Sequence, residues 1–123
     1  MLHHMKLKES PFIKIKNGSK TIELRLNDEK RQQVQVGDFI EFSLLDNPTE
    51  KIQTRVTALH HFNSFQELYA SLPKEKLGYS SSDTPNPDHM DEYYPREKQE
   101  QYGVLGIELR MTELQKFIDA QEH

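Results

Sequence analysis

The clearest pattern in this chain is an alternation of apolar and polar residues between positions 21 and 26. Ile22, Leu24 and Leu26 fall on one side of this segment, and Thr21, Glu23 and Arg25 fall on the other. A period of two predicts a strand with one face in the core. Four further apolar runs, each bounded by turn residues, predict strands at residues 5–8, 39–45, 52–62 and 104–109.

Apolar residues at helical spacing predict short helices on either side of this strand pattern. Phe12 and Ile15 indicate a helix of about two turns that begins with Ser10 as its N-cap and stops at Asn17-Gly18. A second helix is expected to follow Ser64, which can cap it. Its stripe consists of Phe65, Leu68, Tyr69 and Leu72, with Pro73 closing it.

The C-terminal half contains a long irregular segment and two more helices. Residues 74–91 hold three serines, two prolines and a glycine, and their apolar residues follow neither the helical nor the strand period. We therefore predict a mobile loop that borders a cleft. Residues 91–101 are dense in charge and predicted to be helical, with an interruption near Pro95. A last helix at 113–120 is capped by Thr112, and we expect Leu114, Phe117 and Ile118 to face inward.

Short turns between most of the strands favour antiparallel pairing, and a small antiparallel sheet tends to curl in order to protect its edges. The predicted fold class is therefore α+β: a small, mostly antiparallel β-barrel with flanking helices, forming a single domain over residues 1–123. Its core is expected to be one cluster. We place in it Ile22, Leu24, Phe39, Phe42, Val56, Leu105 and Ile107.

The distribution of charge along the chain restricts the classes of ligand that the protein is expected to bind. The chain has a net charge of −4, yet residues 1–31 hold eight Lys/Arg against four Asp/Glu. A basic face on an acidic body is expected, which fits a few phosphate contacts better than wide duplex binding. The absence of cysteine excludes disulfides and thiolate zinc sites and fits a cytoplasmic location. No apolar run is long enough to cross a bilayer, so no membrane partner is expected. We expect neither a cofactor nor a metal site.

Several segments resemble the ASCH domain, a family of the PUA-like superfamily. They are Pro11-Phe12 with Ile15; Gly18 with Lys20-Thr21-Ile22-Glu23-Leu24-Arg25; Val36-Gly37-Asp38-Phe39; and Tyr102-Gly103-Val104-Leu105-Gly106. The resemblance spans nearly the whole chain. The chain looks like the free-standing bacterial members of this family. It implies a small β-barrel with a cleft at its rim, where the Lys-Glu-Arg motif sits and is proposed to bind RNA or a nucleotide.

The residues of this motif also form a site by their own chemistry. Lys20, Thr21, Glu23 and Arg25 lie close together at the start of one strand, and Arg25 is able to hold a phosphate with two hydrogen bonds. Without the family resemblance, a row of exposed ion pairs would be the preferred interpretation. Other candidate ligand-binding residues are Lys30 and Arg31, which either extend the basic face or are solvated turn residues. Tyr79 and Tyr102 are further candidates, which either stack on a base or pack a loop against the barrel.

An alternative is a small hydrolase acting on a modified nucleoside or on RNA, in which Lys20 and Glu23 would be catalytic. The resemblance includes N4-acetylcytidine amidohydrolases, whose motif has a threonine where this chain has Glu23. That replacement removes the expected nucleophile. A third hypothesis is a module whose basic face meets an acidic protein. The sequence leaves the ligand and the oligomeric state open.

Overall fold

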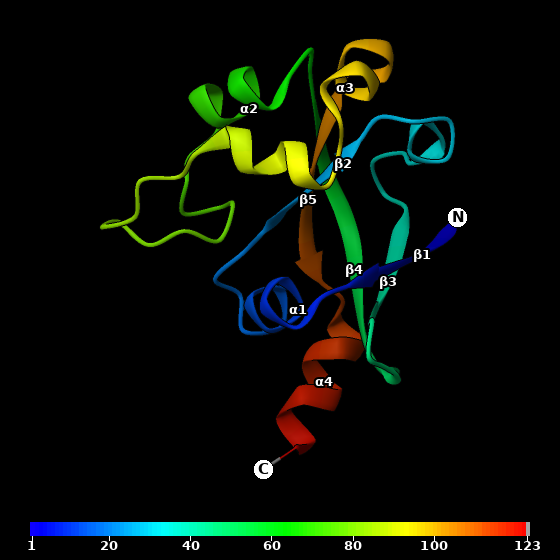
Figure 1. Cartoon of the computed structure of the whole chain (residues 1–123). Helices are drawn as coiled ribbons and strands as arrows, with labels where there is room; N and C mark the ends of the chain where they lie inside the picture. Colours follow the sequence, from blue (N-terminus) through cyan, green and yellow to red (C-terminus); the bar gives the residue numbers. More distant parts are fainter. Residues whose placement is uncertain (123) are drawn as a thin grey trace.

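Five strands form one sheet in the computed structural model, which describes residues 1–122. They are β1 (Leu2–Leu7), β2 (Ile22–Leu26), β3 (Phe39–Leu44), β4 (Asn47–Phe62) and β5 (Val104–Met111). Their order across the sheet is β1-β3-β4-β5-β2. The helices are α1 (Glu9–Lys16), α2 (Phe65–Ser71), α3 (Arg96–Tyr102) and α4 (Glu113–Gln121), with short 3₁₀ helices η1 (Arg31–Gln33) and η2 (Pro87–Glu92) (Figure 1). None of the helices in residues 1–122 is long and apolar enough to cross a membrane.

The α+β class is confirmed, but the sheet is mixed rather than mostly antiparallel. β1 pairs with β3 in parallel, whereas the other three pairings are antiparallel. A parallel pair needs a crossover connection, and α1 together with β2 provides it, which a pattern of short turns does not reveal. β1 and β2 are the two edges of the sheet, so the fold is a curled half-barrel rather than a closed barrel.

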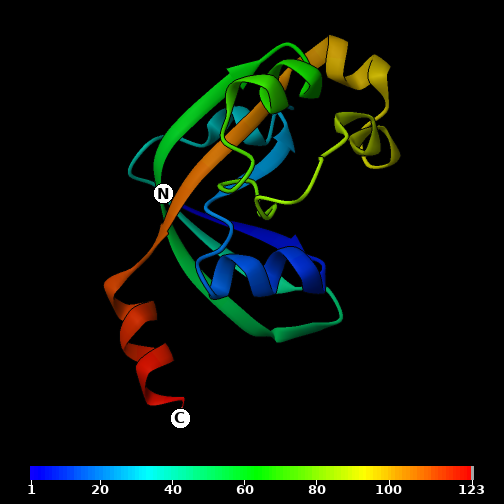
Figure 2. The same cartoon turned by 90° about the vertical axis from the view of Figure 1, so that its left-hand side faces the viewer.

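β4 makes the curl possible. It begins at Asn47, five residues before the predicted start, and runs for 16 residues. Its first half pairs with β3 and its second half with β5, and the register with β5 shifts between Val56 and Ala58. Such bulges bend a strand and increase its twist. The two ends of β4 therefore belong to different parts of the curved sheet (Figure 2).

The core consists of two clusters, so the prediction of a single core is wrong. One cluster lies on the concave side of the sheet and contains Phe12, Ile15, Ile40, Phe42, Ile52, Val56, Leu105 and Ile107 among others. The other lies beneath α2 and contains Ile22, Leu24, Leu26, Phe65, Leu68, Leu77 and Val104. The neighbours Val104 and Leu105 belong to different clusters, so both faces of β5 are covered.

Three local predictions are corrected. Phe39 was expected in the core but is 38% exposed, because Ile40 and Phe42 take the inward positions and a period of two turns Phe39 outward. α1 begins at Glu9 with Lys8 as its N-cap, so Ser10 is not the cap.

The third correction concerns α4, whose apolar residues Leu114, Phe117 and Ile118 are exposed. α4 contacts the sheet through Gln115 instead, whose Oε1 accepts a 2.8 Å hydrogen bond from the backbone N–H of Gln53. The helix extends away from one end of the sheet in both views (Figures 1 and 2).

Candidate functional site

The polar face of β2 points into the half-barrel. Glu23 pairs in register with Ile107, and Arg25 pairs with Leu105. Directly paired residues of antiparallel strands share a face. Glu23 and Arg25 therefore project to the concave side, where Leu105 and Ile107 belong to the core. Ile22, Leu24 and Leu26 project to the opposite side, against α2. The predicted alternation of β2 is thus confirmed, but both of its faces are covered.

Glu23 is the centre of a buried ion triad and is only 5% exposed. Its Oε1 lies 3.1 Å from the Lys20 ammonium, and its Oε2 lies 2.9 Å from Nη2 of Arg25. Nε of Arg25 also donates to Oε2 at 3.1 Å. Burial opposes ionisation of the carboxyl, but Lys20 and Arg25 outweigh it and hold the pKa of Glu23 below its ordinary value. Glu23 is therefore a carboxylate with both oxygens engaged.

Arg25 also connects the two edges of the sheet. Its Nη2 donates a 2.9 Å hydrogen bond to the backbone oxygen of Lys6 in β1. The strands β1 and β2 are not neighbours in the sheet, so this contact spans the gap left by the incomplete barrel. The guanidinium forms the floor of that gap, with one edge on Glu23 and another on β1.

A pocket of about 370 Å³ opens directly above this triad. Its volume falls in the range of small-molecule sites, about 300–1,000 Å³. Among the described residues that line it, five carry positive charges: Lys6, Lys8, Lys14, Lys20 and Arg25. Four more are tyrosines: Tyr69, Tyr79, Tyr93 and Tyr94. Glu23 is the carboxylate of this lining. Ammonium groups and aromatic rings suit an anionic ligand with a planar ring better than a metal ion.

One wall of the pocket is the segment that follows α2, which lies above α1 (Figure 2). The backbone oxygen of Lys76 accepts 2.9 Å hydrogen bonds from the backbone N–H groups of both Thr21 and Ile22. Nζ of Lys14 donates to the Gly78 oxygen at 2.9 Å. Gly78 has a φ of +99°, and a Cβ there would lie 3.3 Å from side-chain carbons of Lys14 and Lys20. The predicted loop thus borders the pocket and is hydrogen-bonded to the motif strand.

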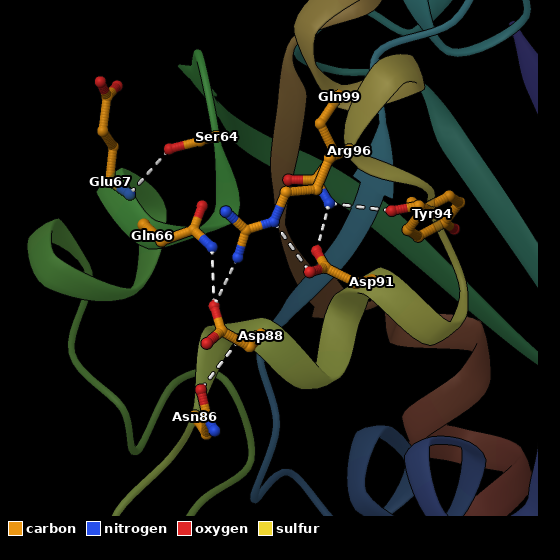
Figure 3. A network of polar contacts seen from close by, with 9 residues as sticks. All are labelled: Ser64, Gln66, Glu67, Asn86, Asp88, Asp91, Tyr94, Arg96 and Gln99. Atoms are coloured by element: carbon orange, nitrogen blue, oxygen red, sulfur yellow. Dashed lines mark hydrogen bonds and ion pairs between the residues drawn. The ribbon is translucent and has the colours of Figure 1, made fainter.

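The opposite wall consists of η2, which supplies Met90, and the two residues that follow it, Tyr93 and Tyr94. A polar network holds η2 in place (Figure 3). Arg96 of α3 donates to Asp91 at 2.9 Å and to Asp88 at 2.8 Å. Gln66 of α2 donates to Asp88 at 3.0 Å, so η2 is linked to helices on both sides. The residues 87–92 had been predicted as loop and helix start, and the network explains why they form an ordered wall.

The structure brings together four of the eight predicted site residues. Lys20, Glu23, Arg25 and Tyr79 line the pocket. Lys30 and Arg31 line a separate hollow next to Arg25. Thr21 is not part of either lining; its backbone N–H donates a hydrogen bond to the Lys76 oxygen. Tyr102 lies elsewhere, with Lys98 above its ring.

Sequence reasoning missed three lysines: Lys6 of β1, Lys8 at the N-cap of α1 and Lys14 of α1. It also missed the tyrosines Tyr69, Tyr93 and Tyr94. The excess of positive charge in residues 1–31 was a usable signal for the lysines. No local pattern in the sequence points to the tyrosines. Their convergence depends on α2 and η2 folding onto the same side of β2.

The structure defines an α+β protein with a curled mixed sheet and a cationic, tyrosine-lined pocket at its open edge. The model of the ASCH domain family matches residues 5–113, which is most of the chain. The chain therefore belongs to the ASCH domain family, as its sequence resemblance had indicated. None of the curated proteins compared with the chain matches it.

Solved structures with the same fold include two of similar size. The crystal structure of the hypothetical protein PH0355 has a TM-score of 0.77 and 29% identity, covering 91% of this chain and all of that one. The solution structure of protein PF0455 from Pyrococcus furiosus has a TM-score of 0.68 and 31% identity, covering 92% and 99%. The ASCH protein from Zymomonas mobilis, at 14% identity and a TM-score of 0.62, covers 99% of this chain and 81% of that one and shares the fold.

Proposed function

We propose that this protein binds RNA or a nucleotide-containing ligand in the pocket above the Lys20–Glu23–Arg25 triad. The observation that carries the proposal is the composition of the lining: five cations and four tyrosines gather around one carboxylate, in a chain whose net charge is −4. Random placement of charge in an acidic protein does not favour such a site. Phosphates pair with the cations, and the base stacks on an aromatic ring.

The tyrosines divide into supporting and ligand-facing rings. Tyr94 stacks on Phe65 with centroids 5.8 Å apart, and the hydroxyls of Tyr69 and Tyr79 lie 3.1 Å from each other. Tyr93, in contrast, is 55% exposed at the pocket, with the Lys8 ammonium 5.0 Å from its ring centre. We propose Tyr93 as the ring that stacks on a base and Lys8 as the cation that reaches the adjoining phosphate.

The cationic side chains of the pocket also divide into a supporting group and a ligand-facing group. Lys20 and Arg25 are committed to Glu23, and their side chains are each only 12% exposed. Lys6 and Lys8 are exposed residues on the rim. The triad therefore sets the shape and the positive potential of the floor, and the rim lysines contribute the salt-dependent contacts.

Binding is favoured over hydrolysis by the state of Glu23. A general base must be able to accept a proton, but the pKa of Glu23 is lowered and both of its oxygens are paired with cations. The threonine of the N4-acetylcytidine amidohydrolases is replaced by this carboxylate. Lys20 and Glu23 are for these reasons assigned a positioning role, and the hydrolase remains the second candidate.

The experiment uses a matched pair of lysine–tyrosine contacts. Tyr93 lies under Lys8 at the pocket, and Tyr102 lies under Lys98 at 5.8 Å outside it. Affinity for a fluorescent single-stranded RNA is measured for Tyr93→Leu and Lys8→Gln, with Tyr102→Leu and Lys98→Gln as controls. Loss of a stacking contact of about 1–3 kcal/mol predicts a weakening of about 5- to 150-fold for Tyr93→Leu.

The control variants should bind as the wild type does, and wild-type affinity should fall as salt rises, with a slope of about −0.7 per phosphate contact. Equal affinities for the Tyr93 and Tyr102 variants would contradict the placement of the base. Absence of binding by the wild type to both RNA and mononucleotides would overturn the proposed function.

A further inference from the structure

A second hollow adjoins the pocket across the gap between the sheet edges. It has a volume of about 380 Å³ and is bounded by β1, the end of β2 and the η1 segment. Lys6 and Arg25 line both spaces. The two hollows are thus neighbours that share a floor, rather than separate features on different faces.

The second hollow is also cationic. Lys30 and Arg31 line it together with the shared Lys6 and Arg25. No carboxylate is present in its lining among residues 1–122. Arg31 is paired with Asp28, whose Oδ2 lies 3.3 Å from Nη1 of Arg31 and whose Oδ1 accepts a 3.1 Å hydrogen bond from the Arg31 backbone N–H. This contact fixes the Arg31 side chain at the edge of the hollow, and Lys30 is exposed beside it.

The residues that line the two spaces differ, and each lining suits a different part of a nucleic acid strand. The pocket has four tyrosines and apolar contacts from Leu77 and Met90, which suits a base. The described lining of the second hollow has no tyrosine, phenylalanine or tryptophan. It consists of four cationic side chains together with His4, Met5 and Ser43, which suits a phosphate better than a base. A free mononucleotide would use the pocket and leave the second group of cations without an anion.

We propose that the ligand is a single-stranded polynucleotide of at least two nucleotides. One base occupies the tyrosine-lined pocket, and the backbone phosphate of the adjacent nucleotide lies in the second hollow against Lys30 and Arg31. Arg25 and Lys6, at the boundary, face the sugar–phosphate link between the two. This inference rests on the proposed function and adds the class of ligand: a strand that runs across the gap between β1 and β2, rather than a free mononucleotide.

The test compares ligands that differ by one linked nucleotide. Titration calorimetry measures the affinities of a nucleoside 5′-monophosphate and of the dinucleotide and trinucleotide of the same base, for wild type, Lys30→Glu and the control Lys116→Glu. Lys116 is an exposed lysine on α4, away from both spaces, paired with Glu113 at 3.3 Å. The expected result is that the wild type binds the longer ligands about tenfold more tightly than the monophosphate.

Lys30→Glu should remove most of that gain and leave monophosphate affinity unchanged, whereas Lys116→Glu should alter neither. This inference would be overturned if the wild type bound all three ligands with equal affinity and Lys30→Glu bound them as the wild type does. If Tyr93→Leu still lowered the affinity for the monophosphate in that case, the proposed function would stand without the inference of a longer ligand. No binding of any ligand by the wild type would overturn both.

Discussion

Replacing Arg25 by methionine tests whether the ion triad holds the open half-barrel together. The change keeps the apolar stem and removes three contacts: a 2.9 Å ion-pair contact and a 3.1 Å hydrogen bond to Glu23, and a 2.9 Å hydrogen bond to the Lys6 oxygen. Removing one partner of a buried ion pair costs about 3–5 kcal/mol, because the remaining charge is buried without compensation. Lys20 still contacts Glu23 and the pocket admits water, so we expect about 3 kcal/mol, the lower end of that range.

Urea unfolding followed by circular dichroism measures this free energy. With a slope of about 1–3 kcal/mol per molar urea, the unfolding midpoint should fall by about 1–3 M. Arg110→Met is the matched control, since Arg110 is an exposed arginine on β5, and a change within about 0.5 kcal/mol is expected there. A loss below about 1 kcal/mol for Arg25→Met would refute the claim that the triad is a structural unit.

Three further predictions concern the same residues. The lowered pKa of Glu23 contributes stability that is present above its ordinary value of 4.5 and is lost as the pH falls through the native value, so Glu23→Gln should flatten the acid side of the unfolding midpoint plotted against pH. N4-Acetylcytidine should not be deacetylated measurably by liquid chromatography, and turnover that survives Glu23→Ala but not Lys20→Ala would contradict this. Gly78→Ala and Gly18→Ala should each cost about 1–2 kcal/mol for their left-handed backbone. Gly78→Ala alone should weaken RNA binding, because a Cβ at Gly78 meets Lys14 and Lys20 and one at Gly18 meets nothing within 4 Å.

The sequence was sufficient for the elements whose pattern is local. The alternation of β2 and the turn at Gly18 predicted a strand with Lys20, Glu23 and Arg25 in one neighbourhood, and the structure has this arrangement. The burial of Glu23 was not predictable in the same way. It depends on the curl of the sheet, which is set by the pairing of β2 with β5 and by the shift in β4, both of which join residues far apart in the chain.

The incorrect predictions also concern features that depend on contacts between residues far apart in the chain. The apolar spacing of Leu114, Phe117 and Ile118 is that of a core-facing helix, yet α4 leaves the sheet. Hydrogen bonds of Thr112 and Gln115 with Gln53 of β4 attach the start of α4 instead. Tyr102 and Tyr79 were equivalent candidates in the sequence. They are separated in the structure because α3 begins beyond η2 and turns Tyr102 away from the pocket. The tyrosines of the pocket therefore come from elements whose relative positions local patterns do not predict.

The location of the ligand is the central claim, and backbone amide chemical-shift mapping with a short single-stranded RNA tests it most directly. We predict that the largest shifts in a ¹H–¹⁵N correlation spectrum occur in residues 6–8, 20–25, 77–79 and 90–94, which surround the pocket. Smaller shifts should occur at Lys30 and Arg31, and α4 should remain unchanged. Shifts concentrated on α4, or an unchanged spectrum at saturating RNA, would contradict the account.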